Sequence, residues 1–321
     1  MDKADSIFIA GNNGMVGSAI ERLLIRRGFN NILRASRAQL DLTRQEDTEQ
    51  FFRENKPRVV IDCAAKVGGI LANNEFRAEF LYDNLQIQNN LIHSSWRFRV
   101  KKLLFLGSSC IYPKFCDQPI KEEYLLSSPL EETNEPYALA KIAGVKLCES
   151  YLRQYGCNFI PVMPTNQYGP NDNYHLENSH VLPALLRKFH EGRVENKPFV
   201  EVWGTGKARR EFMYVDDLAE ACVFLLKNIN AHDIYNNGPL QVNVGTGKDL
   251  SIEELSKKIA KVVGYEGEIK FQLDKPDGTL RKLLDNSRLN SFGWKYKTEL
   301  EDGLGLTYSD FLRNEHQLVE R

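Results

Sequence analysis

The sequence has no long apolar run and no marked excess of either charge. Its 321 residues include 42 basic and 43 acidic side chains, giving a net charge of −1. This balance gives no general reason to bind nucleic acid or an anionic membrane. The first five residues are mostly polar, and the apolar run after them is too short for a signal peptide or a membrane-spanning helix. We therefore expect a cytoplasmic protein that binds neither nucleic acid nor membrane.

Cysteine is scarce, and its spacing excludes two common uses. The six cysteines, at positions 63, 110, 116, 148, 157 and 222, include no C-x-x-C pair. The sequence therefore predicts neither a zinc site nor a disulfide framework, and we expect no bound metal. Buried free cysteine usually behaves as a small core residue, which is the expectation for most of these six.

What the sequence does contain is a regular alternation of apolar strands and amphipathic helices. A composition of 42% hydrophobic residues is enough for a substantial core. Short apolar runs typical of buried parallel strands alternate with helical patterns. The strands are expected at Ser6–Ala10, Arg58–Ile61 and Lys102–Leu106, and the helices near 76–97 and 137–155.

This pattern predicts an α/β protein: a Rossmann-type doubly wound parallel sheet with a smaller C-terminal α/β substrate domain. A polar, Asn-rich stretch after Pro170 interrupts the pattern, and the segment after Glu211 resumes it. We expect a nucleotide-binding domain of residues 1–170 plus 211–246, and a substrate domain of residues 171–210 plus 247–321. The ligand is expected in the cleft between them.

A glycine-rich turn follows the first predicted strand. Gly11, Gly14 and Gly17 stand three apart and lead into a helical pattern. Glycines in such a turn let the backbone approach a pyrophosphate at a helix N-terminus, which is typical of dinucleotide-binding folds.

The end of the second predicted strand, Asn31–Arg34, indicates which dinucleotide binds. An acidic residue there would hold the ribose 2′-hydroxyl of NAD, whereas an arginine accommodates the 2′-phosphate of NADP. This chain has Arg37 at that place. The sequence therefore favours NADP(H).

Tyr137 and Lys141 stand four apart, 29 and 33 residues after Ser108. Side chains at i and i+4 share one face of a helix, and a neighbouring ammonium favours the phenolate, so Lys141 is expected to lower the pKa of Tyr137 toward neutrality. Ser108 follows a buried strand and would donate a second hydrogen bond to the same carbonyl oxygen. Such pairs also occur on ordinary solvated helices, so the pair gains weight only with the glycine-rich turn.

In this order, the turn and the Ser, Tyr and Lys residues resemble the extended short-chain dehydrogenase/reductase superfamily. Within it, the chain resembles the GDP-L-fucose synthase family in the segments AAKVGG, GSSCIYP, NEPYALAK, PTNQYGP, NSHVLP and VWGTG, which begin at residues 64, 107, 134, 164, 178 and 202. The chain departs from the family at Asn12 and Asn13, one of which is often basic, and at Asp62.

The resemblance implies NADPH-dependent 3,5-epimerisation and 4-keto reduction of GDP-4-keto-6-deoxy-D-mannose to GDP-L-fucose. It assigns the catalytic roles to Ser108, Tyr137, Lys141, Cys110 and His180. The cofactor-binding residues that it implies are Gly11, Asn12, Asn13, Gly14, Met15, Val16, Gly17, Arg37, Asp41, Leu42, Ala64, Ala65, Leu106, Gly107, Ser108, Ser109, Lys141, Pro164, Thr165, Asn166, Gln167 and His180.

In this family reading, Cys110 and His180 act as base and acid at C3 and C5 of the keto sugar, on opposite faces. A free thiol is mostly protonated at neutral pH, so a cation must assist Cys110, and His180 or Lys141 is the expected one. Without the motif, a structural cysteine and a surface histidine would be the better interpretation. The substrate contacts are expected from Lys188, Trp203, Arg210 and Asp277.

Three alternatives remain open. A related GDP-4-keto sugar, such as a 6-deoxy-heptose, would need the same catalytic groups. Another nucleotide-sugar epimerase or a dehydratase would recycle NAD, but dehydratases usually carry Thr-Asp-Glu where this chain has Ser108, Ser109 and Cys110. A noncatalytic scaffold would be expected to lose Tyr137 or Lys141.

The resemblance also implies a homodimer through the helices near 76–97 and 137–155.

Overall fold

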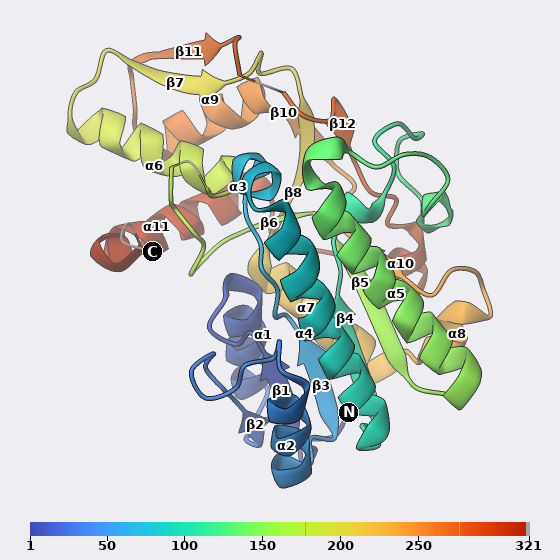
Figure 1. Cartoon of the computed structure of the whole chain (residues 1–321). Helices are drawn as coiled ribbons and strands as arrows, with labels where there is room; N and C mark the ends of the chain where they lie inside the picture. Colours follow the sequence, from blue (N-terminus) through green and yellow to red (C-terminus); the bar gives the residue numbers. More distant parts are fainter. Residues whose placement is uncertain (177, 276, 319–321) are drawn as a thin grey trace.

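A six-stranded parallel sheet forms the centre of the larger part of the molecule (Figure 1). The computed structural model describes residues 1–176, 178–275 and 277–318. The sheet has the order β2-β1-β3-β4-β5-β9, so the chain moves outward from β1 in both directions, as a doubly wound sheet requires. The strands are β1 (Ile7–Ala10), β2 (Ile32–Leu33), β3 (Val59–Asp62), β4 (Lys102–Leu106), β5 (Phe159–Pro164) and β9 (Val242–Val244).

Two groups of helices accompany this sheet. Helix α1 packs against α7, whereas α4 packs against both α2 and α5. This layering confirms the predicted fold class and the predicted positions of the main strands and helices. The helices are α1 (Met15–Arg26), α2 (Gln45–Asn55), α4 (Arg77–Arg97), α5 (Glu135–Tyr155) and α7 (Val215–Asn228).

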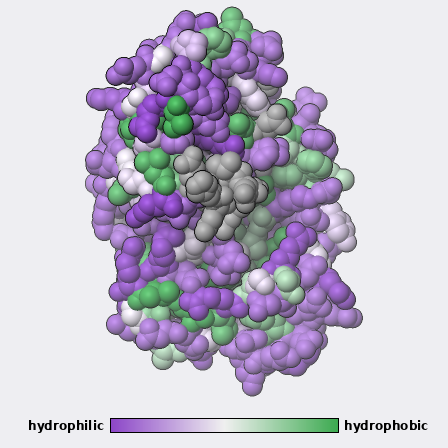
Figure 2. Space-filling model, turned by 90° about the vertical axis from the view of Figure 1, so that its left-hand side faces the viewer, coloured by the Kyte–Doolittle hydropathy of each residue, from purple (hydrophilic) through white to green (hydrophobic). Residues whose placement is uncertain are grey.

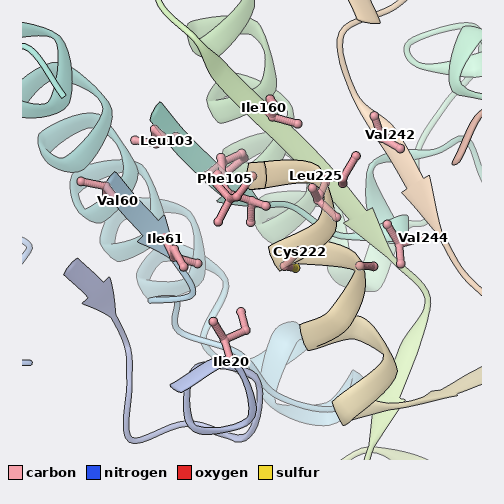
Figure 3. Close-up of a cluster of buried hydrophobic side chains, with 14 of the residues drawn as sticks. Ile20, Val60, Ile61, Leu103, Phe105, Ile160, Cys222, Leu225, Val242 and Val244 are labelled. Atoms are coloured by element: carbon pink, nitrogen blue, oxygen red, sulfur yellow. The ribbon is translucent and has the colours of Figure 1, made fainter. Parts of the chain in front are cut away.

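The core of this part is continuous from the strands to α7 (Figure 3). Parallel strands that are covered on both faces are largely apolar, and β1, β3 and β5 are buried at every position, including Asp62 at the end of β3. Branched and aromatic side chains of neighbouring strands meet α7 in the layer shown. The labelled members are Ile20, Val60, Ile61, Leu103, Phe105, Ile160, Cys222, Leu225, Val242 and Val244, all of which are fully buried.

The remaining strands belong to a smaller region at the top of Figure 1. Strand β8 pairs with β10, β12 and β6, and a separate pair joins β7 to β11. Helix α9 packs against both α6 and α11. The elements are β6 (Asn166–Tyr168), α6 (Val181–Val194), β7 (Phe199–Trp203), β8 (Arg209–Tyr214), β10 (Asp249–Ser251), α9 (Ile252–Val263), β11 (Glu268–Gln272), β12 (Arg281–Lys282) and α11 (Leu300–Leu318).

Helix α9 illustrates how local sequence defines this region. Ser251 and Glu254 form a reciprocal capping box at its start. Gly264 ends it in the left-handed conformation with φ of 77°. Apolar residues at helical spacing face a second core that also receives Phe189 and Phe311. Capping and amphipathic periodicity together therefore fix where this helix begins, ends and packs.

The described residues form two separate cores, and each core draws on segments that are far apart in the sequence. Leu284, Leu289 and Trp294, which the prediction placed in the substrate domain, pack in the first core. The polypeptide therefore returns to the first core between β12 and α11. Short helices complete the fold: α3 (Ile70–Glu75), α8 (Ala231–Tyr235), α10 (Ser287–Ser291), η1 (Ser109–Ile111), η2 (Glu122–Tyr124) and η3 (Glu132–Asn134).

The molecular face in Figure 2 is largely hydrophilic, and its hydrophobic residues form small separate groups. Within the described residues, no helix has the length and apolar character needed to cross a bilayer.

Asp172 introduces a pH-dependent cost into the second core. It is buried, one of its carboxylate oxygens has no hydrogen-bond partner among the described residues, and burial raises its pKa to about 7. Well below the ordinary Asp pKa of 3.8, the carboxyl is protonated in the folded and unfolded chains alike and costs nothing. As the pH rises toward 7 and beyond, the unfolded chain ionises readily whereas the folded chain resists ionisation, so the folded state loses stability.

We expect Asp172→Asn to remove this loss. Relative to wild type, the variant should gain roughly 2 to 4 kcal/mol of unfolding free energy between pH 4.5 and about 8. Urea unfolding at both pH values measures the difference. The exposed Glu266→Gln is the matched control. Identical pH dependence in Asp172→Asn and wild type would contradict the prediction.

Candidate active site

The glycine-rich turn forms a close-packed cradle in front of α1. Gly11 has φ of 78°, and a Cβ there would lie 2.9 Å from the backbone of Cys63 and Ala64, so only glycine fits. Gly14 is the N-cap of α1, it provides no side-chain cap, and the first turn contains no acidic residue. The side-chain oxygen of Asn12 is buried without a partner. The close backbone approach and the uncapped start of α1 suit a bound anion such as a diphosphate, whereas the Asn12 oxygen can only accept a hydrogen bond and suits a hydroxyl group of the ligand.

Beyond β2, the two candidate arginines differ in their surroundings. Arg34 pairs with Glu21 of α1 at 2.6 Å. Arg37 is exposed and lies within electrostatic range of Asp41, where it helps the two hydrogen bonds from Thr43 to lower the pKa of Asp41. Arg37 is therefore the arginine whose charge is more open to a ligand.

Tyr137 and Lys141 lie on the first turns of α5, next to Leu106 at the end of β4. The Lys141 ammonium is buried and donates to the Leu106 carbonyl at 2.8 Å, 6.0 Å from the centre of the Tyr137 ring. Burial raises the pKa of Tyr137, the Cys110 sulfur adds to the rise, and a hydrogen bond with Ser108 opposes it. The prediction that Lys141 lowers this pKa is wrong for the protein alone, because desolvation of the phenolate dominates.

Asp62 explains part of the Lys141 environment. It ends β3 and is buried, and one of its carboxylate oxygens lacks a hydrogen-bond partner. Burial raises the pKa of Asp62 to about 6, with Lys141 acting in the opposite direction. Burial likewise lowers the pKa of Lys141, and Asp62 opposes that shift. The sequence marks Asp62 only as a departure from the family, and nothing in its local pattern predicts that its charge acts on Lys141.

Cys110 faces two polar groups. Its sulfur accepts from the Lys282 ammonium at 3.6 Å and from the Asn134 side-chain amide at 3.8 Å. The Cys110 backbone N–H donates to the Ser108 hydroxyl at 3.2 Å, which fixes the turn after β4. The cation beside the thiol is therefore Lys282, whereas the prediction named His180 or Lys141. Strand β12 brings Lys282 into the cleft. The sequence around Cys110 contains no spacing that predicts this contact.

His180 immediately precedes α6, inside the cleft but open to solvent. The surrounding protein lowers its pKa by desolvation, and Lys282 adds to the shift. A lower pKa makes the imidazolium a stronger acid but reduces its population. Gly69 donates to the Asn178 carbonyl at 2.9 Å, and a Cβ on Gly69 would lie 2.7 Å from the Ser179 carbonyl. The glycine pair 68–69 thus allows the His180 segment to approach the first domain.

The segment after β5 joins the two parts of the molecule at the cleft. Thr165 and Asn166 both donate to the Glu211 carbonyl, at 3.1 and 2.9 Å. The Gln167 side-chain amide donates to the Thr165 carbonyl at 3.1 Å. The oxygen of the same side-chain amide is buried and has no hydrogen-bond partner among the described residues. The side-chain amide oxygen of Gln167 therefore remains available as a hydrogen-bond acceptor in the cleft.

The predicted substrate residues form a second wall. The Lys188 ammonium lies 5.2 Å from the centre of the Trp203 ring, and burial lowers its pKa. Arg210 donates to the Thr279 carbonyl at 2.5 Å and to the Asp277 carbonyl at 3.2 Å. The Asp277 carboxylate accepts from the Thr205 N–H and hydroxyl, each at 2.7 Å. Asp277 therefore orders this wall through its own contacts.

One cleft of about 400 Å³ brings most of the predicted residues together. Sequence reasoning overlooked Asn134 and passed over Lys282. The predicted residues along the cleft are Met15, Val16, Leu106, Gly107, Ser108, Ser109, Cys110, Tyr137, Pro164, Thr165, Asn166, Gln167, His180, Lys188, Trp203, Arg210 and Asp277. Outside its lining lie Gly11, Asn12, Asn13, Gly14, Gly17, Arg37, Asp41, Leu42, Ala64, Ala65 and Lys141.

Comparison with known proteins gives concordant matches. Residues 7–245 match the model of the NAD dependent epimerase/dehydratase family. The chain is 56% identical to GDP-L-fucose synthase 1 of Arabidopsis thaliana, over 98% of this chain and 95% of that protein. It is 52% identical to the GDP-L-fucose synthase of Escherichia coli K12, over 96% and 97% of the two chains.

A solved structure supplies a further likeness. The GDP-mannoheptose C4 reductase from Campylobacter jejuni, with NADP bound, superposes with a TM-score of 0.89 at 42% identity, covering 97% of this chain and 99% of that chain.

Proposed function

Because this chain belongs to the NAD dependent epimerase/dehydratase family and, within it, to the GDP-L-fucose synthases, we propose that it converts GDP-4-keto-6-deoxy-D-mannose to GDP-L-fucose. The reaction combines epimerisation at C3 and C5 with NADPH-dependent reduction at C4. The observation that carries the proposal is that one cleft holds both chemistries: Ser108 and Tyr137 for a carbonyl oxygen, and Cys110 and His180 for carbon acids.

The residues fit the cofactor. The uncapped start of α1, the Gly11 cradle and the unpartnered oxygen of Asn12 suit a dinucleotide diphosphate with its ribose. Lys141 and the 164–167 loop would hold the nicotinamide end. When bound, NADPH supplies the hydride that reduces the ketone. The chain's own part is to orient the ketone oxygen toward Tyr137 and Ser108, with Tyr137 donating the proton.

Epimerisation follows from the acidity of the carbons beside the ketone. The electron pair left at C3 or C5 delocalises onto the C4 oxygen, where hydrogen bonds from Ser108 and Tyr137 stabilise the developing charge. Cys110 removes the proton from one face, and His180 returns one to the other. Lys188, Trp203 and Arg210 form the wall that would hold the GDP group.

A second candidate substrate has specific support. The solved C. jejuni relative is named a GDP-mannoheptose C4 reductase, and a GDP-4-keto-heptose presents the same reacting atoms. Incubating the protein with NADPH and each keto sugar, and following nicotinamide absorbance, separates the candidates by kcat/KM. Faster turnover of the hexose supports the proposal. Faster turnover of the heptose would make that sugar the substrate. If NADPH were oxidised with neither sugar, both candidate substrates would be rejected.

The proposal also predicts cofactor choice through Arg37. Arg37→Ala should weaken NADPH binding by roughly 1 to 3 kcal/mol, because a charge-assisted contact to the 2′-phosphate is lost. NADH binding should hardly change. Titration by nicotinamide fluorescence measures both affinities. Arg34→Ala, whose arginine already pairs with Glu21, is the control, and equal losses of NADPH and NADH in Arg37→Ala would remove Arg37 from this role.

We further propose a cytoplasmic homodimer that forms through α4 and α5. All six cysteines are free, which suits a reducing compartment. Large apolar side chains, Tyr82 of α4 and Leu139 of α5, are 62% and 44% exposed, and burial against a second copy would remove them from water.

Charged substitutions on these helices test the dimer. Tyr82→Glu and Leu139→Glu should each shift the protein toward the monomer at micromolar concentration, because an unpaired carboxylate is costly in an apolar interface. Light scattering measures the mass. Leu312→Glu alters a residue of α11 that is about as exposed as Leu139, at 46%, and should leave the dimer intact. A monomeric wild type would count against the proposal.

A further inference from the structure

Lys282 is distinguished among the cations of the cleft by the contact of its ammonium with the Cys110 thiol. Among the described residues, no carboxylate pairs with it, and its ammonium contacts the Cys110 sulfur at 3.6 Å. Its neighbour Arg281 instead pairs with Asp249 at 2.5 Å. Arg210, which β12 pairing places beside Lys282, has its guanidinium occupied by backbone carbonyls. The uncompensated positive charge is therefore directed at the thiol.

We propose that Lys282 is a positioning residue for the epimerisation, holding Cys110 as the thiolate that acts as base. The inference rests on the proposed function and deepens it. The ammonium donates to the sulfur, and an opposite charge at this range favours the anion. In the step itself, the thiolate takes the proton from C3 or C5 to become a thiol, and the carbon's electron pair moves onto the C4 oxygen. Asn134 completes the sulfur's hydrogen bonds from the start of α5.

The competing role for Lys282 is binding of the substrate diphosphate. Both roles need a cation, but only the first acts when no substrate is present. The reactivity of Cys110 toward an alkylating reagent in the free protein therefore separates them, because the thiolate is the reacting form.

The experiment measures alkylation of Cys110 by iodoacetamide at pH 7.5, read by mass spectrometry of the peptide so that the other cysteines do not contribute. Lys282→Met should slow alkylation by roughly 10-fold, because the ammonium that donates to the sulfur is lost. Lys282→Arg should retain most of the rate. Arg281→Met, which removes the neighbouring paired cation, is the matched control and should stay close to wild type.

Deuterium incorporation at C3 and C5 of the sugar links this reactivity to the reaction. Alkylation and incorporation that fall together in Lys282→Met support the proposal. A wild-type alkylation rate in Lys282→Met, with GDP affinity reduced, assigns Lys282 to the diphosphate and overturns it. Slower alkylation with undiminished incorporation overturns it as well. Alkylation needs no substrate, so failure of the wild type to turn over the keto sugar would reject the proposed function without mimicking any of these results.

Discussion

Tyr137→Phe should slow the rate of ketone reduction by roughly 10²- to 10⁴-fold while leaving NADPH affinity almost unchanged. The substitution deletes only the phenolic hydroxyl, which lies in the cleft and shares a hydrogen bond with Ser108. Burial raises the pKa of Tyr137, so the phenol is protonated at neutral pH and can act as the acid. The phenyl ring that remains still packs edge-on against Phe80, which preserves the shape of the site.

Single-turnover oxidation of NADPH by the keto sugar measures this loss, and fluorescence titration measures cofactor affinity. Tyr151→Phe is a matched control on the same helix, because the Tyr151 hydroxyl bonds to His93 at 2.7 Å and is absent from the cleft lining. Its turnover should be unaffected. Undiminished reduction by Tyr137→Phe would mean that another group supplies the proton.

The fold was predictable because its signals are local. The β1 strand, the glycine turn and α1 occupy adjacent residues, so the turn geometry that requires Gly11 is visible in the sequence. The i, i+4 spacing of Tyr137 and Lys141 predicts their shared helix for the same reason. Continuous apolar runs also indicate buried parallel strands.

The electrostatics of the site could not be predicted in this way. Lys282 contacts Cys110, which lies 172 positions earlier, because β12 pairs with β8 in a specific register. The residues around position 282 carry no pattern that predicts this register. The spacing of Tyr137 and Lys141 likewise shows that a cation is near but not that burial outweighs it. Tertiary packing decides both the partners of a charge and the cost of removing it from water.

Cys110→Ser should nearly abolish deuterium incorporation at C3 and C5 of the product in deuterated water, whereas the wild type should incorporate deuterium at both. Serine preserves the shape, but its hydroxyl is a much weaker acid than the thiol, so its anion is far less accessible as a base. Transfer of hydride to C4 needs no deprotonation of carbon. The variant should therefore still oxidise NADPH slowly and reduce the unepimerised ketone to a different 6-deoxyhexose.

Mass spectrometry and NMR of the product separate these two outcomes. Cys116→Ser is the matched control, because Cys116 is a nearby thiol that donates to the Pro113 carbonyl and is absent from the cleft lining. It should incorporate deuterium like the wild type. If Cys110→Ser exchanged both protons at the wild-type rate, the thiol would be structural, and the base would have to be His180, the other proton-transfer group proposed for the epimerisation. His180→Asn would then have to abolish the exchange that Cys110→Ser leaves intact.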